Sequence, residues 1–139
     1  DEVGLRVARE CIRRLLRRKS VGGAITVLGL TFKENVPDIR NSKVVGIVNE
    51  LMSFGLQVQV HDPLALPEEV EHEYGIKLVE MNALRPADAI IFAVAHDAYS
   101  AEGWTLMRRL LRDGQGVVLD VKSKLDRDQT PSGVDLWRL

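Results

Sequence analysis

The segment from Leu30 to Ser42 is the richest part of this chain in residues that could do chemistry. It places the aromatic side chain of Phe32 beside the ammonium of Lys33, with Arg40 just before a predicted helix. An anion at that helix N-terminus would meet unpaired backbone N–H groups, the positive end of the helix dipole and one or two cations. Phe32 could pack on a base or a ribose while Lys33 neutralises phosphate oxygens. The segment therefore predicts a site for a phosphorylated nucleotide.

The same segment has a second interpretation that needs no ligand. Asp38 would pair with Arg40, and Ser42 would cap the following helix, so that the residues form a long structured turn. Ordered stretches of this length in a compact α/β domain usually have a use, and the sequence therefore favours a function here. The structured turn stays open as the alternative.

Weaker candidates follow other apolar runs. Lys122 and Lys124 come directly after such a run, so they could reach the same anion at the same sheet edge, or they could lie in solvent. His96 and Asp97 suggest a general base, although capping of a loop is the favoured role. Asp62 ends a strand where a ribose-binding acid would sit, and a turn-forming role is favoured for it as well.

Several kinds of site find no support in the sequence. Gly29 has no second and third glycine at the spacing of the usual dinucleotide fingerprint, so the backbone cannot close on a pyrophosphate in the standard way. The histidines and the single cysteine show no metal-ligand spacing, so no metal site is predicted. Cys11 falls within a helical pattern, where a buried thiol is the common case. No arrangement of Ser, His and Asp or of Cys and His indicates a catalytic nucleophile.

The elements that must position these candidates are short apolar runs that alternate with helical patterns. Residues 1–19 are typical of an amphipathic helix that breaks at residues 20–23, with an apolar face at Leu5, Ala8, Ile12, Leu15 and Leu16. Strands are expected at residues 24–29, 56–62, 76–79, 88–94 and 116–121, and helices at residues 43–54, 68–73 and 100–112. The tail, residues 126–139, is expected to be an irregular crossover on the surface.

Nearly continuous apolar strands that alternate with helices are typical of a parallel sheet covered on both faces. The predicted fold is therefore α/β, a Rossmann-like three-layer domain with a mostly parallel sheet of about five strands, preceded by an N-terminal helix. In such sheets, ligands bind at the carboxyl ends of the strands, near the point where the strand order reverses. Attention therefore falls on the loops after Gly29, Asp62, Val94 and Val121.

The composition limits the classes of protein to consider. The 139 residues suffice for one compact domain, and a net charge of −1 argues against a nucleic-acid binder. A single cysteine cannot form an intramolecular disulfide, so a reducing cytoplasm is expected. No apolar run approaches the roughly 18 residues of a membrane span, and no signal-peptide pattern opens the chain. The chain starts at an Asp and runs straight into a helical pattern, which suggests a piece of a longer protein.

A longer motif carries a resemblance to a known family. Residues 27–42 read VLGLTFKENVPDIRNS, which resembles the signature of the C-terminal, UDP-binding domain of the UDP-glucose/GDP-mannose dehydrogenase family. The similarity continues at HDP, ADA and LDVK, which are residues 61–63, 87–89 and 119–122. It implies that residues 20–139 form a UDP-sugar-binding, Rossmann-like domain. Residues 1–19 are similar to the end of the central linker helix that joins the two Rossmann domains of the family.

Two short stretches point to one branch of that family. Residues 34–41 and the AVAH stretch at residues 93–96 are most similar to the enzymes that oxidise UDP-N-acetylhexosamines. The resemblance implies an NAD-dependent UDP-N-acetyl-D-glucosamine or -galactosamine 6-dehydrogenase. Such an enzyme oxidises the sugar C6 alcohol through an aldehyde to a carboxylate, for bacterial capsule or O-antigen.

The resemblance also implies roles for individual residues. Phe32 and Lys33 would meet the UDP part of the substrate, and Arg40 corresponds to an arginine that reaches NAD across the interdomain cleft. Lys122 occupies the position of a substrate-contacting basic residue that is commonly Arg, and a lysine cannot make the same bidentate contact. Catalytic residues lie upstream in the family, and Cys11 does not sit in its nucleophile motif. None is therefore expected in this chain, which alone should be inactive.

The partners implied by the resemblance are the UDP-sugar, the N-terminal and central domains of the same chain, and further copies in a homo-oligomer. NAD would be bound mainly by the N-terminal domain, and neither nucleic acid nor a membrane is expected as a partner. Two other functions remain open. One is a UDP-glucose 6-dehydrogenase of the same family, and the other is a non-catalytic nucleotide-binding regulatory module, which would bind nucleotide by itself.

Overall fold

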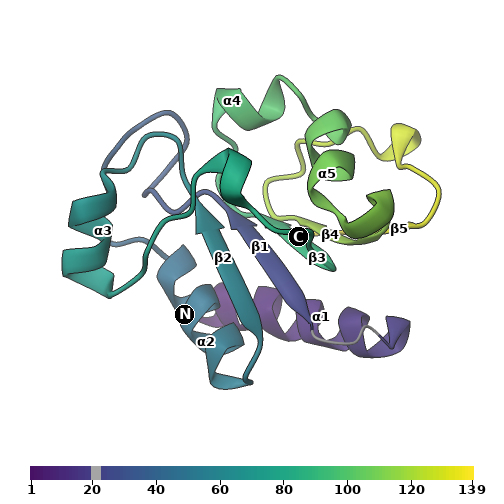
Figure 1. Ribbon diagram of the computed structural model, residues 1–139, viewed down its shortest axis with the longest axis horizontal. Coiled ribbons are helices and arrows are strands. Elements are labelled where there is room, and N and C mark those ends of the chain that lie inside the picture. Colours follow the sequence, from purple (N-terminus) through teal and green to yellow (C-terminus); the bar gives the residue numbers. More distant parts are fainter. Residues whose placement is uncertain (20–22) are drawn as a thin grey trace.

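A five-stranded parallel sheet forms the centre of the computed structural model, which describes residues 1–19 and 23–139 (Figure 1). Its strands are β1 (Ala24–Leu28), β2 (Gln57–His61), β3 (Ala89–Phe92), β4 (Gly116–Asp120) and β5 (Val134–Arg138). They lie in the order β2-β1-β3-β4-β5, and each strand runs parallel to its neighbours. The chain moves from β1 to β2 on one side and then returns to β3 on the other. The strand order therefore reverses between β1 and β3.

Helices cover both faces of the sheet, as the sequence predicts. One face is covered by α1 (Glu2–Arg18) and α2 (Val44–Ser53), and the other by α4 (Asp97–Ser100) and α5 (Trp104–Leu110) (Figure 1). The helix α3 (Pro67–Tyr74) lies beyond β2, and three short 3-10 turns, at Met81–Ala83, Arg112–Gly114 and Arg127–Gln129, complete the chain. This arrangement confirms the Rossmann-like three-layer fold. Within the described residues, no helix has the length and apolar character to cross a membrane.

Alternating side chains of the strands fill two separate cores. Ile25 and Val27 of β1 pack with Ile91 of β3 in the core under α1 and α2. Leu28 belongs to the other core, with Phe92 and the side chains of α5. Because successive residues of a strand point to opposite faces, a strand covered on both faces needs apolar residues throughout. The nearly continuous apolar runs of the sequence have this origin.

The buried face of α1 differs from the expected one. The helix buries Gly4, Val7, Ala8, Cys11 and Leu15, whereas Leu16 is 73% exposed. These five residues follow helical spacing, so the interpretation of an amphipathic helix is confirmed and only its rotation was wrong. The buried thiol of Cys11 packs in the core, and burial raises its pKa to about 12. The predicted break at residues 20–23 lies largely outside the described residues, and Lys19 adopts the left-handed conformation after α1.

The largest correction concerns the last strand. The tail that was expected to be irregular contains β5, which pairs with β4 from Gly116 to Asp120. Conversely, residues 76–79 form no strand, and Leu78 makes one isolated bridge to Val60. The predicted count of about five strands is therefore right, but one of the five was misplaced.

Long-range partners explain why β5 escaped the sequence analysis. Asp135 interrupts its apolar pattern, and the guanidinium of Arg14 from α1 pairs with that carboxylate at 2.5 Å. The guanidinium of Arg6 lies 6.0 Å from the centre of the Trp137 ring. Both contacts join β5 to a helix that lies far away along the chain.

A local feature divides the helix expected over residues 100–112. Gly103 has a φ of 55° and separates α4 from α5.

The close approach of Gly29 to Val94 generates the first prediction. Gly29 has a φ of 96°, and an added Cβ would lie 2.5 Å from the Val94 Cβ and 2.9 Å from its backbone nitrogen. We expect Gly29→Ala to lower the free energy of unfolding by about 2 kcal/mol or more, because strain and a backbone clash coincide. Gly46→Ala is the matched control, since nothing lies within 4 Å of its added Cβ in α2. It should stabilise the chain by about 0.5 kcal/mol. Urea unfolding of both variants measures the difference, and equal stabilities would contradict it.

Candidate functional site

Three loops meet at the carboxyl ends of the strands, beside the point where the strand order reverses. They follow β1, β2 and β3, and β1 lies between the other two strands. The backbone N–H of Gly29 donates to the carbonyl of His61 at 2.8 Å, and the N–H groups of Ala93 and Val94 donate to the Leu28 carbonyl. The candidate residues of the sequence lie in or next to these loops. Strand order thus brings them to one edge of the sheet.

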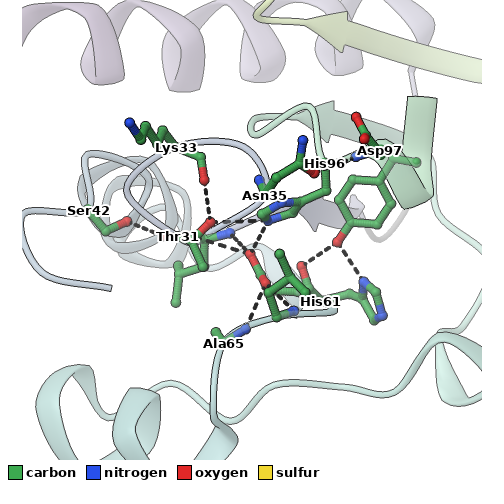
Figure 2. Close-up of polar contacts among 12 residues, drawn as sticks. Thr31, Lys33, Asn35, Ser42, His61, Ala65, His96 and Asp97 are labelled. Atoms are coloured by element: carbon green, nitrogen blue, oxygen red, sulfur yellow. Dashed lines mark hydrogen bonds and ion pairs between the residues drawn. The ribbon is translucent and has the colours of Figure 1, made fainter. Parts of the chain in front are cut away.

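A buried polar network of Asp62, His96 and Thr31 joins the three loops (Figure 2). The Nε2 atom of His96 lies 2.9 Å from Oδ2 of Asp62 and 3.1 Å from Oγ1 of Thr31. The three residues are almost completely shielded from solvent. Each comes from a different loop, so the network fastens the loops to one another.

The Asp62 carboxylate accepts hydrogen bonds at both oxygens. Its Oδ2 accepts from the backbone N–H groups of Leu30 and Thr31, at 2.7 and 3.1 Å, and from His96. Its Oδ1 accepts from the N–H groups of Leu64 and Ala65 at 2.8 and 3.0 Å. Burial raises the pKa of this carboxyl, but the hydrogen bonds to the ionised form outweigh burial and hold the pKa below its usual range. Asp62 is therefore the turn-forming residue that the sequence favours.

His96 uses both ring nitrogens inside the protein. The backbone N–H of Asn35 donates to Nδ1 at 2.9 Å, so Nδ1 carries no proton and the ring proton is on Nε2. The carboxylate of Asp97, which the sequence paired with His96, makes no hydrogen bond to the ring. Asp97 instead donates its backbone N–H to Oδ1 of Asn35 at 3.0 Å. With the ring 1% exposed, the geometry favours loop capping by His96 over a general base.

The loop after β1 is also ordered from within. The Phe32 N–H donates to the Asp38 carbonyl at 2.7 Å, and Oγ1 of Thr31 donates to the Lys33 carbonyl at 3.0 Å. Asp38 pairs with Arg40 through two side-chain hydrogen bonds, as the structured-turn interpretation expects. The side-chain hydrogen bonds, and after them the hydrogen bond from the backbone N–H of Arg40, lower the pKa of the Asp38 carboxyl to about 2.

Ser42 does not cap α2, which corrects the second part of that interpretation. Its hydroxyl donates to the Leu30 carbonyl instead, and so closes the loop on itself. The residue at the N-cap of α2 is Lys43, which makes no side-chain capping hydrogen bond. The loop is therefore a structured turn, and its ordering leaves the first turn of α2 without a side-chain cap.

A cleft of about 150 Å³ lies beside this loop, and it gathers three of the four predicted site residues. Phe32, Lys33 and Lys122 line it, and Phe32 is 54% exposed. Lys124 lies outside that lining, and so does Arg40, whose side chain is 85% exposed in its pair with Asp38. The structure thus separates the residues expected to meet the substrate from the residue expected to meet NAD.

The cleft combines cations with an apolar wall. Lys43 lines it together with Lys33 and Lys122, and its ammonium lies 3.6 Å from the exposed carboxylate of Asp1. Asp1 also lines the cleft, so one carboxylate lies among the three cations. Most of the other lining side chains are apolar, among them Val44, Ile47, Val94 and Val121. Such a surface suits a ligand that carries phosphate charge on an apolar or aromatic body. In the described residues, no group of three His, Cys, Asp or Glu side chains could hold a metal ion.

Sequence reasoning missed two features of this site. Lys43 was not singled out, although its place directly before a helix in a cationic segment was a usable signal. The pairing of His96 with Asp62 had no local signal, because the two residues lie in different loops. Only the strand order brings these loops together.

Comparisons with known proteins give the chain a family context. Residues 26–127 match the UDP-glucose/GDP-mannose dehydrogenase family, UDP binding domain. The UDP-N-acetyl-D-glucosamine 6-dehydrogenase of Pseudomonas aeruginosa is 41% identical over 132 residues, 94% of this chain and 31% of that protein. Protein CapL of Staphylococcus aureus is 36% identical over 141 residues, 100% of this chain and 33% of that protein. The chain therefore spans about a third of the length of these curated relatives.

A solved structure shares the fold. The crystal structure of NDP-N-acetyl-D-galactosaminuronic acid dehydrogenase from Methanosarcina mazei Go1 matches with a TM-score of 0.83. The match covers 97% of this chain and 28% of the Methanosarcina chain. The sequence identity is 21%, so this likeness bears on the fold alone.

The five donors around Asp62 generate a prediction on stability and pH. In Asp62→Asn an NH₂ group replaces one accepting oxygen and faces backbone N–H groups. We expect the free energy of unfolding at neutral pH to fall on the order of 3 kcal/mol. Because the pKa of Asp62 is lowered on folding, the unfolded state binds the proton first as pH falls below about 4. The native protein should therefore lose stability there, and Asp62→Asn should lose less.

Urea unfolding between about pH 3 and pH 7 measures both effects. Asp97→Asn is the matched control, because its exposed carboxylate lies next to the network without taking part in it. It should change the stability little. A pH dependence of Asp62→Asn as steep as that of the native chain would contradict the prediction.

Proposed function

Since the chain belongs to the UDP-glucose/GDP-mannose dehydrogenase family, we propose that it is the UDP-sugar-binding domain of an NAD-dependent UDP-N-acetylhexosamine 6-dehydrogenase. The whole enzyme would oxidise the C6 alcohol of UDP-N-acetyl-D-glucosamine or -galactosamine through the aldehyde to the carboxylate, with NAD as hydride acceptor. The named activity of the Pseudomonas relative supports this substrate class. The product would serve bacterial surface polysaccharide synthesis from the cytoplasm.

The observation that carries the proposal is the cationic cleft at the reversal of the strand order. We propose that the ammonium groups of Lys33, Lys122 and Lys43 neutralise the diphosphate, because all three line the same cleft. Phe32 borders the cleft with an exposed ring that could pack on the uracil or the ribose. Asp62 and His96 would not contact the ligand, since both are buried and hydrogen-bonded within the loops.

NAD would be held mainly by other parts of the enzyme. The one glycine at the end of β1, Gly29, packs against Val94, and no second and third glycine follow it at the spacing of the dinucleotide fingerprint. In the proposal, the described residues therefore supply no complete dinucleotide site of their own. In the proposal, the exposed guanidinium of Arg40 reaches NAD from the rim of the domain, where it now pairs with Asp38.

The domain organisation in this proposal has two parts. Residues 1–19 would be the end of the central linker helix and residues 20–139 the UDP-sugar-binding domain. The side chains of Val7 and Cys11 in α1 lie in the same core as Ile25 of β1. The linker helix would thus end by covering one face of the sheet. The N-terminal and central domains of the full-length protein, and further copies of it in a homo-oligomer, would complete the enzyme.

Binding of UDP to the chain tests the cleft. We expect Lys33→Ala and Lys122→Ala each to weaken UDP binding about tenfold, because each removes a charge-assisted contact to phosphate. Lys124→Ala is the matched control, since Lys124 has the same charge in the same loop and lies outside the cleft lining. Uridine, which lacks the diphosphate, should bind all variants alike. An NMR titration suits the weak affinity of a partial site.

The lysine variants can also contradict the proposal. Equal loss of UDP binding in Lys124→Ala would indicate a diffuse charge effect in place of a site. Unchanged binding in Lys33→Ala and Lys122→Ala would place the nucleotide elsewhere.

Substrate choice is tested with the full-length enzyme that contains this chain. NADH production with UDP-N-acetyl-D-glucosamine or UDP-N-acetyl-D-galactosamine should greatly exceed that with UDP-glucose. Preference for UDP-glucose would retain the family and overturn the branch. Failure with all three, combined with tight UDP binding by the chain alone, would favour a regulatory module.

A further inference from the structure

His96 holds both ends of the turn that carries Phe32 and Lys33. At the start of the turn, its Nε2 atom lies 3.1 Å from Oγ1 of Thr31. At the far end, its Nδ1 atom accepts the backbone N–H of Asn35 at 2.9 Å. Figure 2 shows the Lys33 side chain leaving this turn away from the imidazole, while its carbonyl points toward the network. The buried ring thus lies beneath the segment whose outer side borders the cleft.

We propose that His96 is a positioning residue for the nucleotide sugar, and that it acts through its Nδ1 contact to the backbone of Asn35. The inference rests on the proposed function and assigns to His96 a task separate from holding the fold together. The contact fixes where the turn returns after Lys33, and so fixes the direction in which Phe32 and Lys33 face the cleft. A preorganised turn loses less conformational entropy when it binds its ligand.

The two nitrogens of His96 divide these tasks. On the Nε2 side, Thr31 has a second anchor, because its backbone N–H donates to Asp62 at 3.1 Å. On the Nδ1 side, Asn35 has a φ of 65°, in the left-handed region that Asn tolerates but does not prefer. The backbone N–H of Asn35 donates to Nδ1, whereas the backbone N–H of Thr31 donates to Asp62 and not to His96. The backbone at the far end of the turn therefore depends on His96 more directly than the backbone at its start.

The Asn35 side chain supports the same end of the turn from the other direction. Its Oδ1 accepts the N–H of Asp97, the residue that follows His96. Asn35 and the His96–Asp97 pair therefore exchange hydrogen bonds reciprocally between the loop after β1 and the loop after β3. Such a pair of bonds couples the position of the binding loop to β3, a rigid central strand of the sheet.

Two amide substitutions separate the two nitrogens. An Asn side chain places its acceptor oxygen near the position of Nδ1, whereas the amide nitrogen of Gln reaches toward the position of Nε2. His96→Asn should keep the Asn35 contact, lose the donor to Asp62 and lower the melting temperature. His96→Gln should keep more of the thermal stability and lose the Asn35 contact. If His96 had a purely structural role, the less stable variant would also bind UDP more weakly. Our inference predicts that the more stable variant, His96→Gln, binds UDP more weakly.

The experiment is an NMR titration of the native chain and both variants with UDP, together with their melting temperatures. We expect His96→Gln to raise the Kd for UDP about tenfold and His96→Asn to change it less than about threefold, although His96→Asn is the less stable variant. Amide exchange of Asn35 without ligand should rise in His96→Gln alone. Unchanged affinity in His96→Gln, or affinities that follow the melting temperatures, would overturn the inference.

A measurement on the native chain covers the case in which a variant does not fold. The imidazole ¹⁵N signals of His96 should show Nδ1 without a proton and coupled through the hydrogen bond to the Asn35 amide. A protonated Nδ1, or one without that coupling, would overturn the inference. Failure of the native chain to bind UDP would instead refute the proposed function, so the two failures have different signatures.

Discussion

The carboxylate of Asp62, buried with five hydrogen-bond donors around it, is the interaction on which the rest of the site depends. It lies at the end of β2, and its partners come from the loop after β1, from its own turn and from His96 after β3. A buried charge is tolerated when its oxygens are satisfied, and breaking one partner leaves an expensive unpaired group. The three loops are therefore held in one arrangement. That arrangement is what gives the loop after β1 a defined surface toward the cleft.

This organisation separates the interior polar groups from the ligand-facing ones. Asp62 and His96 face each other inside the protein, whereas Lys33, Lys43 and Lys122 line the cleft. A negative ligand at the cleft would thus meet cations, while the buried negative charge is compensated by hydrogen bonds on its own side. Rigidity and affinity can in this way be set by different residues.

Helix α1 contributes to the core, to the contacts of β5 and to the lining of the cleft. The helix places Val7, Ala8 and Cys11 in the core, and Arg14 compensates the charge of Asp135 in β5. The edge strand β5 pairs with β4 along its whole length, and a helix at the other end of the chain neutralises its carboxylate. The same helix lines the cleft with Val7.

Local patterns in the sequence determined most of the elements, and the motif determined the candidate residues. The apolar runs predicted β1 to β4, and the helical spacing predicted α1 and α2. The segment from Phe32 to Arg40 supplied most of the candidate site residues. These signals can be found in the sequence because the residues that form each of them lie close together along the chain. Tertiary structure decided the rest. It set β5 beside a helix whose Arg14 pairs with Asp135, and it decided which face of α1 is buried. It made Asp62, and not Asp97, the carboxylate partner of His96. It also gathered Phe32, Lys33 and Lys122 at one cleft and left Arg40 outside that cleft. Each of these outcomes joins residues far apart in the chain, and such pairs become neighbours only when the order of strands in the sheet is set.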